Sequence, residues 1–86
     1  MLESTIRVGL KEGLHARPAT EFVKRAGKYS CEIKLGKDGK FVDGKSILGL
    51  MALAVPFGQE VTLRTSGIDD EEAMNELVKF LAEEEK

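Results

Sequence analysis

The sequence contains only one histidine, one cysteine and one tyrosine, and it has no tryptophan. With a single cysteine, Cys31, no disulfide can form within the chain, which fits a reducing cytoplasm. One cysteine and one histidine in distant segments supply neither a metal ligand set nor a hydrolytic triad. We therefore expect no metal, no other cofactor and no free-standing enzyme. His15 is the main candidate for a chemically reactive residue.

Long apolar runs are also missing. The longest covers residues 47–57, far short of the ~20 residues of a membrane-spanning helix, and no secretory signal is visible at the N-terminus. Charged residues make up 33% of the chain with a net charge of -2, which gives no reason to expect nucleic-acid or membrane binding. The 86 residues, 42% of them hydrophobic, suit one small domain with its own core.

Alternating and helical spacings divide the chain into seven elements. Apolar residues alternate over residues 5–10, 31–35, 41–42 and 61–65, which indicates four strands. Helical spacing begins near residues 16, 47 and 70, and Asp38-Gly39 favours a tight hairpin between the second and third strands. The order strand, helix, strand, strand, helix, strand, helix predicts an α+β fold with helices on one face of a mainly antiparallel sheet.

The last helix carries the clearest start signal. Asp69 is the expected N-cap, with Glu72 completing a capping box, and Ile68 and Ala73 occupy the positions of a hydrophobic staple. Residues 83–85 are expected to fray. The helix should turn one apolar stripe to the core: Ala73, Met74, Leu77, Val78 and Leu81.

His15 lies where the loop after the first strand becomes the first helix. The N–H groups of Ala16 and Arg17 lack helical partners there, and with the helix dipole they favour an anion. Arg17 adds a guanidinium suited to phosphate oxygens, and Pro18 fixes the backbone of the first turn. A histidine at a helix start is most often only a cap or a surface residue, so these residues alone indicate an anion-binding helix start, with a phosphohistidine as one interpretation.

Ser46 precedes a short helix that is apolar nearly all round. A serine in this place usually only caps the helix, and regulatory phosphorylation is the alternative. So many apolar residues cannot all be buried in a small domain. Helical spacing turns Leu50 and Leu53 to the core and leaves an exposed docking patch of Ile47, Leu48 and Met51.

Two segments of the chain resemble the signatures of a known family. Residues 13–19, GLHARPA, and residues 45–51, KSILGLM, are similar to the active-site and regulatory-serine motifs of HPr. HPr is the histidine phosphocarrier of the bacterial phosphoenolpyruvate-dependent sugar phosphotransferase system. The resemblance extends over essentially the whole chain. It implies an open-faced sandwich with a four-stranded antiparallel sheet of order 1-4-2-3 and three helices on one face.

The same resemblance implies roles for particular residues. His15 would accept a phosphoryl group through Nδ1 from enzyme I and donate it to an enzyme IIA domain, with Arg17 and the backbone of residues 16–17 stabilising the group. Ser46 would be the target of an HPr kinase/phosphorylase. The docking surface would comprise Ile47, Leu48 and Met51, with Lys24 and Lys45 as supporting charges. We expect a monomer with transient interfaces.

Several positions depart from the family pattern, and alternatives stay open. Glu12 stands near His15, where its charge would repel a phosphoryl group, and Asp43 precedes Ser46 and would disfavour a phosphate there. Pro56-Phe57 is an unusual pair that extends the apolar patch. One divergent relative carries Gln in place of the active histidine, and His15 argues against that class. A paralogous carrier in a nitrogen-linked relay, and a Ser46-phosphorylated co-regulator of transcription, remain alternative functions.

Overall fold

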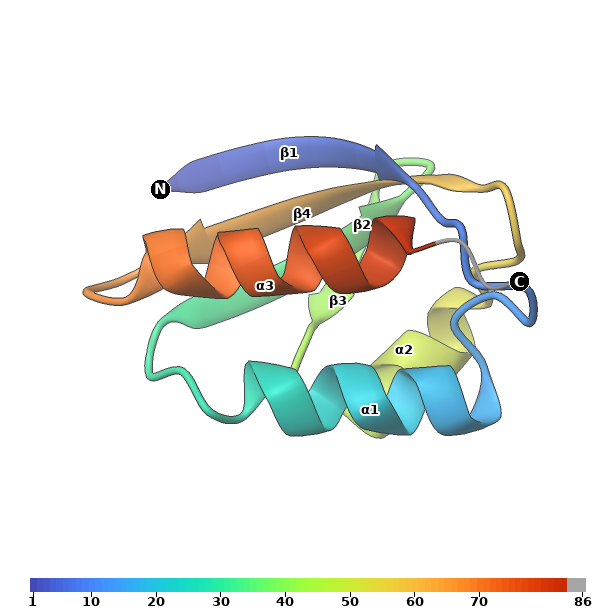
Figure 1. The fold of residues 1–86 in the computed structure, drawn as a ribbon, viewed down its shortest axis with the longest axis horizontal. Helices are drawn as coiled ribbons and strands as arrows, with labels where there is room; N and C mark the ends of the chain where they lie inside the picture. The colour runs from blue at the N-terminus through green and yellow to red at the C-terminus, as the bar shows by residue number, and fades with distance from the viewer. Residues whose placement is uncertain (84–86) are drawn as a thin grey trace.

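Four antiparallel strands and three helices form two layers in a computed structural model that describes residues 1–83 (Figure 1). The sheet has the strand order β1-β4-β2-β3, with every neighbouring pair antiparallel. The predicted element order and topology are therefore confirmed. Within residues 1–83, no helix has the length and apolar character needed to cross a bilayer. The elements are β1 (Leu2–Arg7), α1 (Ala16–Ala26), β2 (Glu32–Lys37), β3 (Lys40–Asp43), α2 (Ile47–Leu53), β4 (Glu60–Ser66) and α3 (Asp70–Ala82).

The core lies between the sheet and the helices. α3 packs on β1 and β4, α2 packs on β2 and β3, and α1 contacts both other helices. The apolar stripe predicted for the last helix is confirmed, since all its members are buried except Val78, which is half-buried. The predicted hairpin is also confirmed: Asp38 and Gly39 take φ values of 51° and 85°, which an Asp-Gly pair tolerates.

The first strand ends earlier than its alternation predicts. β1 stops at Arg7, opposite Glu60, the first residue of β4. Val8 and Leu10 are buried as expected, but they belong to a connection that leaves the sheet. Gly9 crosses the end of α3, where its N–H donates to Leu81 O at 2.8 Å, and an added Cβ would lie 2.7 Å from the Ala82 carbonyl oxygen.

The predicted capping box of α3 is wrong. Asp69 is the N-cap, but its side chain makes no bond to the helix. Its carboxylate accepts hydrogen bonds from Ser30 N at 2.8 Å and Cys31 N at 2.9 Å, and so ties the start of α3 to the segment before β2. The staple is absent too, because Ile68 is 97% exposed. Glu83 is the C-cap of α3, and the other residues expected to fray lie outside the described part of the chain.

A second polar link joins the end of α1 to α3. The Glu76 carboxylate accepts a hydrogen bond from the Tyr29 hydroxyl and from Lys28 Nζ at 3.1 Å, and lies 3.7 Å from the Arg25 guanidinium. The hydrogen bond to Glu76 is the main reason that the pKa of Tyr29 rises from 10.0 to about 12. The phenol therefore stays protonated in the folded chain at pH values where a free tyrosine ionises.

Replacement of Asp69 by asparagine should destabilise the protein in a pH-dependent way. Hydrogen bonding by Ser30, and secondarily by Cys31, lowers the pKa of the Asp69 carboxyl below its ordinary value. A lowered folded-state pKa contributes stability that is complete above the unfolded-state pKa of about 4 and is lost as the pH falls through the folded-state value. In urea, the free energy of unfolding of Asp69→Asn should therefore be lower than that of wild type at pH 7, and this difference should shrink toward pH 3. An equal difference in the free energy of unfolding at both pH values would contradict this account. The same pH-dependent difference in the control variant Asp70→Asn would contradict it too.

The single tyrosine allows a direct test of the Glu76 link. Absorbance at 295 nm reports Tyr29 alone, because the chain has one tyrosine and no tryptophan. We expect half-ionisation at about pH 12 in wild type and at a clearly lower pH in Glu76→Gln, because the variant loses the charged hydrogen-bond acceptor. The raised pKa contributes stability below pH 10 that is lost as the pH rises through the folded-state value. Far-UV circular dichroism at each pH must confirm a folded chain, and coincident titrations of the two folded proteins would refute the link.

Candidate functional site

The connection from β1 to α1 is fixed to the segment that follows α2. Leu14 is fully buried, and its N–H donates to Val55 O at 2.8 Å. Gly13 has φ +69°, and a Cβ there would lie 2.3 Å from Val55 O and 3.0 Å from Phe57 N. Only glycine permits both this backbone conformation and this close approach. The position of His15 therefore depends on segments about forty residues apart in the sequence.

His15 is the N-cap residue of α1, with an extended backbone (φ -124°, ψ 162°). Its carbonyl accepts a bond from Ala19 N at 3.4 Å, whereas its side chain makes no capping bond and is partly exposed. Ala16 and Arg17 carry the first two N–H groups of the helix, which have no intrahelical acceptor, and Pro18 has no N–H at all. The imidazole thus belongs to the residue directly before two amides that have no acceptor within residues 1–83, at the positive end of a helix.

Ala16 has an unusual backbone. Its φ is +46°, in the left-handed region that residues with a Cβ rarely enter. The sequence gives no signal for this, because alanine is not a residue that favours the left-handed conformation. The conformation lies at the junction between the His15 segment and the first turn of α1, so the turn at the candidate site is strained.

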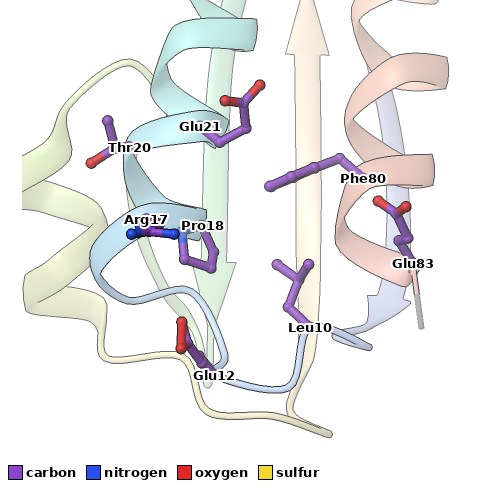
Figure 2. Close-up of a pocket in the computed structure, with 8 residues that line it drawn as sticks. All are labelled: Leu10, Glu12, Arg17, Pro18, Thr20, Glu21, Phe80 and Glu83. Atoms are coloured by element: carbon purple, nitrogen blue, oxygen red, sulfur yellow. The ribbon is translucent and has the colours of Figure 1, made fainter. Parts of the chain in front are cut away.

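Arg17 lines an open hollow between α1 and α3 (Figure 2). Arg17 and Glu12 lie on the α2 side of this hollow, and Phe80 and Glu83 lie on the α3 side. Arg17 is exposed, and no carboxylate of residues 1–83 forms an ion pair with it. The guanidinium is therefore available to an incoming anion, and three acidic residues line the same hollow: Glu12, Glu21 and Glu83.

The second predicted segment folds as expected around Ser46. Ser46 Oγ accepts a hydrogen bond from Gly49 N at 3.0 Å, so its role as N-cap of α2 is confirmed. Asp43 Oδ1 accepts a bond from Lys45 N at 2.9 Å, and its carbonyl accepts one from Ser46 N at 3.1 Å. The Asp43 carboxylate thus lies at the turn that leads directly into Ser46.

The apolar helix divides as its spacing predicts. Leu50 and Leu53 are buried. On the opposite side, Leu48 is 79% and Met51 is 48% exposed, while Ile47 is half-buried against the core. Leu48 and Met51 are therefore the most accessible residues of the predicted docking patch.

The two lysines expected to support docking differ in their surroundings. Lys24 is exposed on α1. Lys45 Nζ donates to the carbonyl oxygen of Tyr29 at 2.6 Å, beyond the C-terminal end of α1. Since the 11 residues of α1 span about 16 Å, the Lys45 ammonium and His15 lie at opposite ends of the helix. Ala16 and Arg17 directly follow His15 in the chain, whereas the Lys45 ammonium lies at the other end of α1. Arg17 lines the hollow between α1 and α3, and His15 is not among the residues that line it.

Comparison with known proteins identifies the family of the chain. The family described as the PTS HPr component phosphorylation site matches residues 2–83. The chain belongs to the HPr family. The HPr-like protein Crh of Halalkalibacterium halodurans is 49% identical over 84 residues, which cover 98% of this chain and 100% of that protein. The family match confirms the predicted assignment to the HPr phosphocarriers of the phosphotransferase system.

Solved structures of the HPr family share the fold. The phosphocarrier protein HPr from Bacillus anthracis superposes with a TM-score of 0.91 at 42% identity, covering 93% of this chain and 95% of that one. Crh from Bacillus subtilis gives a TM-score of 0.78 at 46% identity, covering 100% and 99%. The latter structure is described as a dimer formed by a swapping domain. The monomer expected for this chain is therefore not confirmed and stays a prediction.

Replacement of Ala16 by glycine tests the strained turn. A left-handed residue with a Cβ costs roughly 1–2 kcal/mol, whereas glycine adopts this region freely. We expect Ala16→Gly to raise the free energy of unfolding by about 1 kcal/mol, as measured in urea. Ala52→Gly, at an exposed position inside α2, should instead lower it by about 1 kcal/mol. Destabilisation of similar size in both variants would show that Ala16 is not left-handed in solution.

Proposed function

We propose that the chain is a phosphocarrier that accepts a phosphoryl group on His15 from phosphorylated enzyme I and donates it to an enzyme IIA domain in sugar uptake. One observation carries the proposal: a partly exposed imidazole without a capping bond directly precedes the unpaired amides of Ala16 and Arg17. Membership of the HPr family supports it.

The proposed chemistry is a transfer between two nitrogen or oxygen nucleophiles. A lone pair of the neutral His15 ring, on Nδ1, attacks phosphorus, while the bond from phosphorus to the donor breaks and its electron pair leaves with the donor. The amides of Ala16 and Arg17 donate to the phosphoryl oxygens, and the Arg17 guanidinium balances their charge. Transfer to enzyme IIA is the same step with His15 as the leaving group.

A carrier must release its partners quickly, which favours small transient interfaces. Leu48 and Met51 are the docking residues that exposure supports best, with Ile47 at their edge. Lys24 is free to face an acidic partner. Lys45 supports docking only if its ammonium leaves the Tyr29 carbonyl oxygen. The chain would act in the cytoplasm, as a monomer.

Glu12 is proposed to limit how long His15 holds the phosphoryl group. It lies three residues before His15 and on the same side of the hollow as Arg17 (Figure 2). Its carboxylate repels the phosphoryl oxygens and competes with them for the guanidinium. Both effects favour onward transfer over storage.

Regulation through Ser46 is the second candidate function. An HPr kinase/phosphorylase would place a phosphate on Ser46 at the start of α2, where the helix dipole favours it, and the modified chain would bind a transcription regulator. The solved structure of a relative at 46% identity, Crh of Bacillus subtilis, is described as a catabolite repression HPr, and this favours the regulatory candidate. The neighbouring Asp43 carboxylate opposes it electrostatically. A carrier in a nitrogen-linked relay would use the same His15 chemistry with different partners.

Incubation with phosphoenolpyruvate, magnesium and a matched enzyme I tests the carrier function. Intact mass should increase by one phosphate that is lost in acid, and Ser46→Ala should behave like wild type. His15→Ala should take up none. Arg17→Ala should be phosphorylated at least about tenfold more slowly, because a buried donor to a developing anion is worth roughly 10²–10³ in rate and this one is exposed.

Two results would contradict the carrier function. Wild-type protein that stays unmodified with several sources of enzyme I would exclude His15 as an acceptor in this relay. Acid-labile phosphate on the His15→Ala variant would place the acceptor elsewhere. Uptake of one acid-labile phosphate by Ser46→Ala would show that Ser46 is not the acceptor in this reaction.

A further inference from the structure

Exposed large apolar side chains are concentrated in the segment from α2 to the start of β4. Half of the exposed large hydrophobic residues in the described chain lie within residues 48–57: Leu48, Met51 and Phe57. Phe57 is the aromatic member and is 61% exposed. Exposed apolar clusters on small proteins mark interaction surfaces, and aromatic residues are enriched at the centres of interfaces.

The exposure of Phe57 is not the result of a loose loop. On one side of it, Leu14 N donates to Val55 O at 2.8 Å. On the other side, Gly58 N donates to Val8 O at 2.8 Å, and Val8 N donates to Gln59 O at 2.9 Å. Phe57 is therefore held between two backbone attachments to the connection that carries His15.

Phe57 lies within the area that a phosphoryl donor has to cover. Its backbone N would lie 3.0 Å from a Cβ built on Gly13, and Gly13 is two residues, at most about 7.6 Å, from His15. Even a small transient interface buries about 600 Å² on each partner, a disc of about 14 Å radius. A protein that brings phosphorus to His15 must therefore also come close to Phe57.

We propose that Phe57 determines partner specificity by docking against an apolar surface beside the active centre of the protein that phosphorylates His15. This inference rests on the proposed carrier function and names the chemistry of its partner. A charged or hydrated surface would have to lose water against the ring without gaining a hydrogen bond. A donor that carries apolar or aromatic side chains at this position is favoured instead.

Ile68 supplies a matched control. It is 97% exposed but lies just before α3, whereas the His15 connection crosses the other end of that helix at Leu81 (Figure 1). The 13 residues of α3 span about 19 Å. Substitution of Ile68 therefore changes surface hydrophobicity by a similar amount outside the area that the donor covers.

The test is steady-state phosphorylation by a matched enzyme I with phosphoenolpyruvate. We expect Phe57→Ala to raise KM for the carrier about tenfold, Phe57→Lys to raise it further, and Phe57→Leu to stay within about threefold of wild type. The kcat and the hydrolysis half-life of the isolated phosphohistidine should change less than about twofold, because Phe57 does not touch the reacting atoms. Ile68→Ala and Ile68→Lys should match wild type, and urea unfolding should confirm that every variant is folded.

The possible failures are distinguishable. Unchanged KM in Phe57→Ala and Phe57→Lys, with normal phosphorylation of His15, overturns this inference alone. A loss of kcat or an altered hydrolysis half-life also overturns it, since Phe57 would then act on the geometry of His15. Failure of the wild-type chain to take up phosphate overturns the carrier function and this inference together.

Discussion

The hydrogen bond from the Leu14 amide to the Val55 carbonyl is the constraint on which the site depends. Leu14 fills the core while its backbone is tied to the segment after α2. The next residue, His15, must then lie at the surface where α1 begins, with its imidazole partly exposed and the amides of Ala16 and Arg17 unpaired. The absence of a side chain at Gly13 is what allows the two segments to approach so closely.

The sequence predicted those features that depend on local patterns. Alternation and helical spacing located the seven elements, the serine cap of α2 and the Asp38-Gly39 hairpin, because each is determined by residues near one another in the chain. The topology came from the resemblance to HPr, whose two motifs are specific. Leu50 and Leu53 were separated correctly from Leu48 and Met51, since one face of a short helix on a sheet must be buried.

Contacts between distant segments were not predictable in this way. Asp69 has the sequence signature of a capping box, but its carboxylate accepts hydrogen bonds from the amides of Ser30 and Cys31 and not from its own helix. The Tyr29–Glu76 link and the position of the Lys45 ammonium likewise require knowledge of how α1, α2 and α3 pack. The left-handed conformation of Ala16 lies where the β1–α1 connection enters the helix, and an alanine gives no sign of it.

The site combines features that a permanent binding pocket would avoid. A strained left-handed residue costs folding free energy, and exposed apolar side chains cost solubility. In a carrier these features serve transient occupation: the amides and Arg17 meet a phosphoryl group, and the apolar residues meet a partner that must soon leave. In the proposed function, the Glu12 carboxylate, which lines the same hollow as Arg17, would favour release over storage.

The most direct test of this arrangement is to follow the backbone amides of Ala16 and Arg17 by ¹H–¹⁵N NMR while His15 is phosphorylated. If these amides bind the phosphoryl oxygens, both proton resonances should move strongly downfield, while that of Gly49, already bonded to Ser46 Oγ, stays in place. Complete phosphorylation of His15 with the Ala16 and Arg17 resonances unmoved would contradict the account.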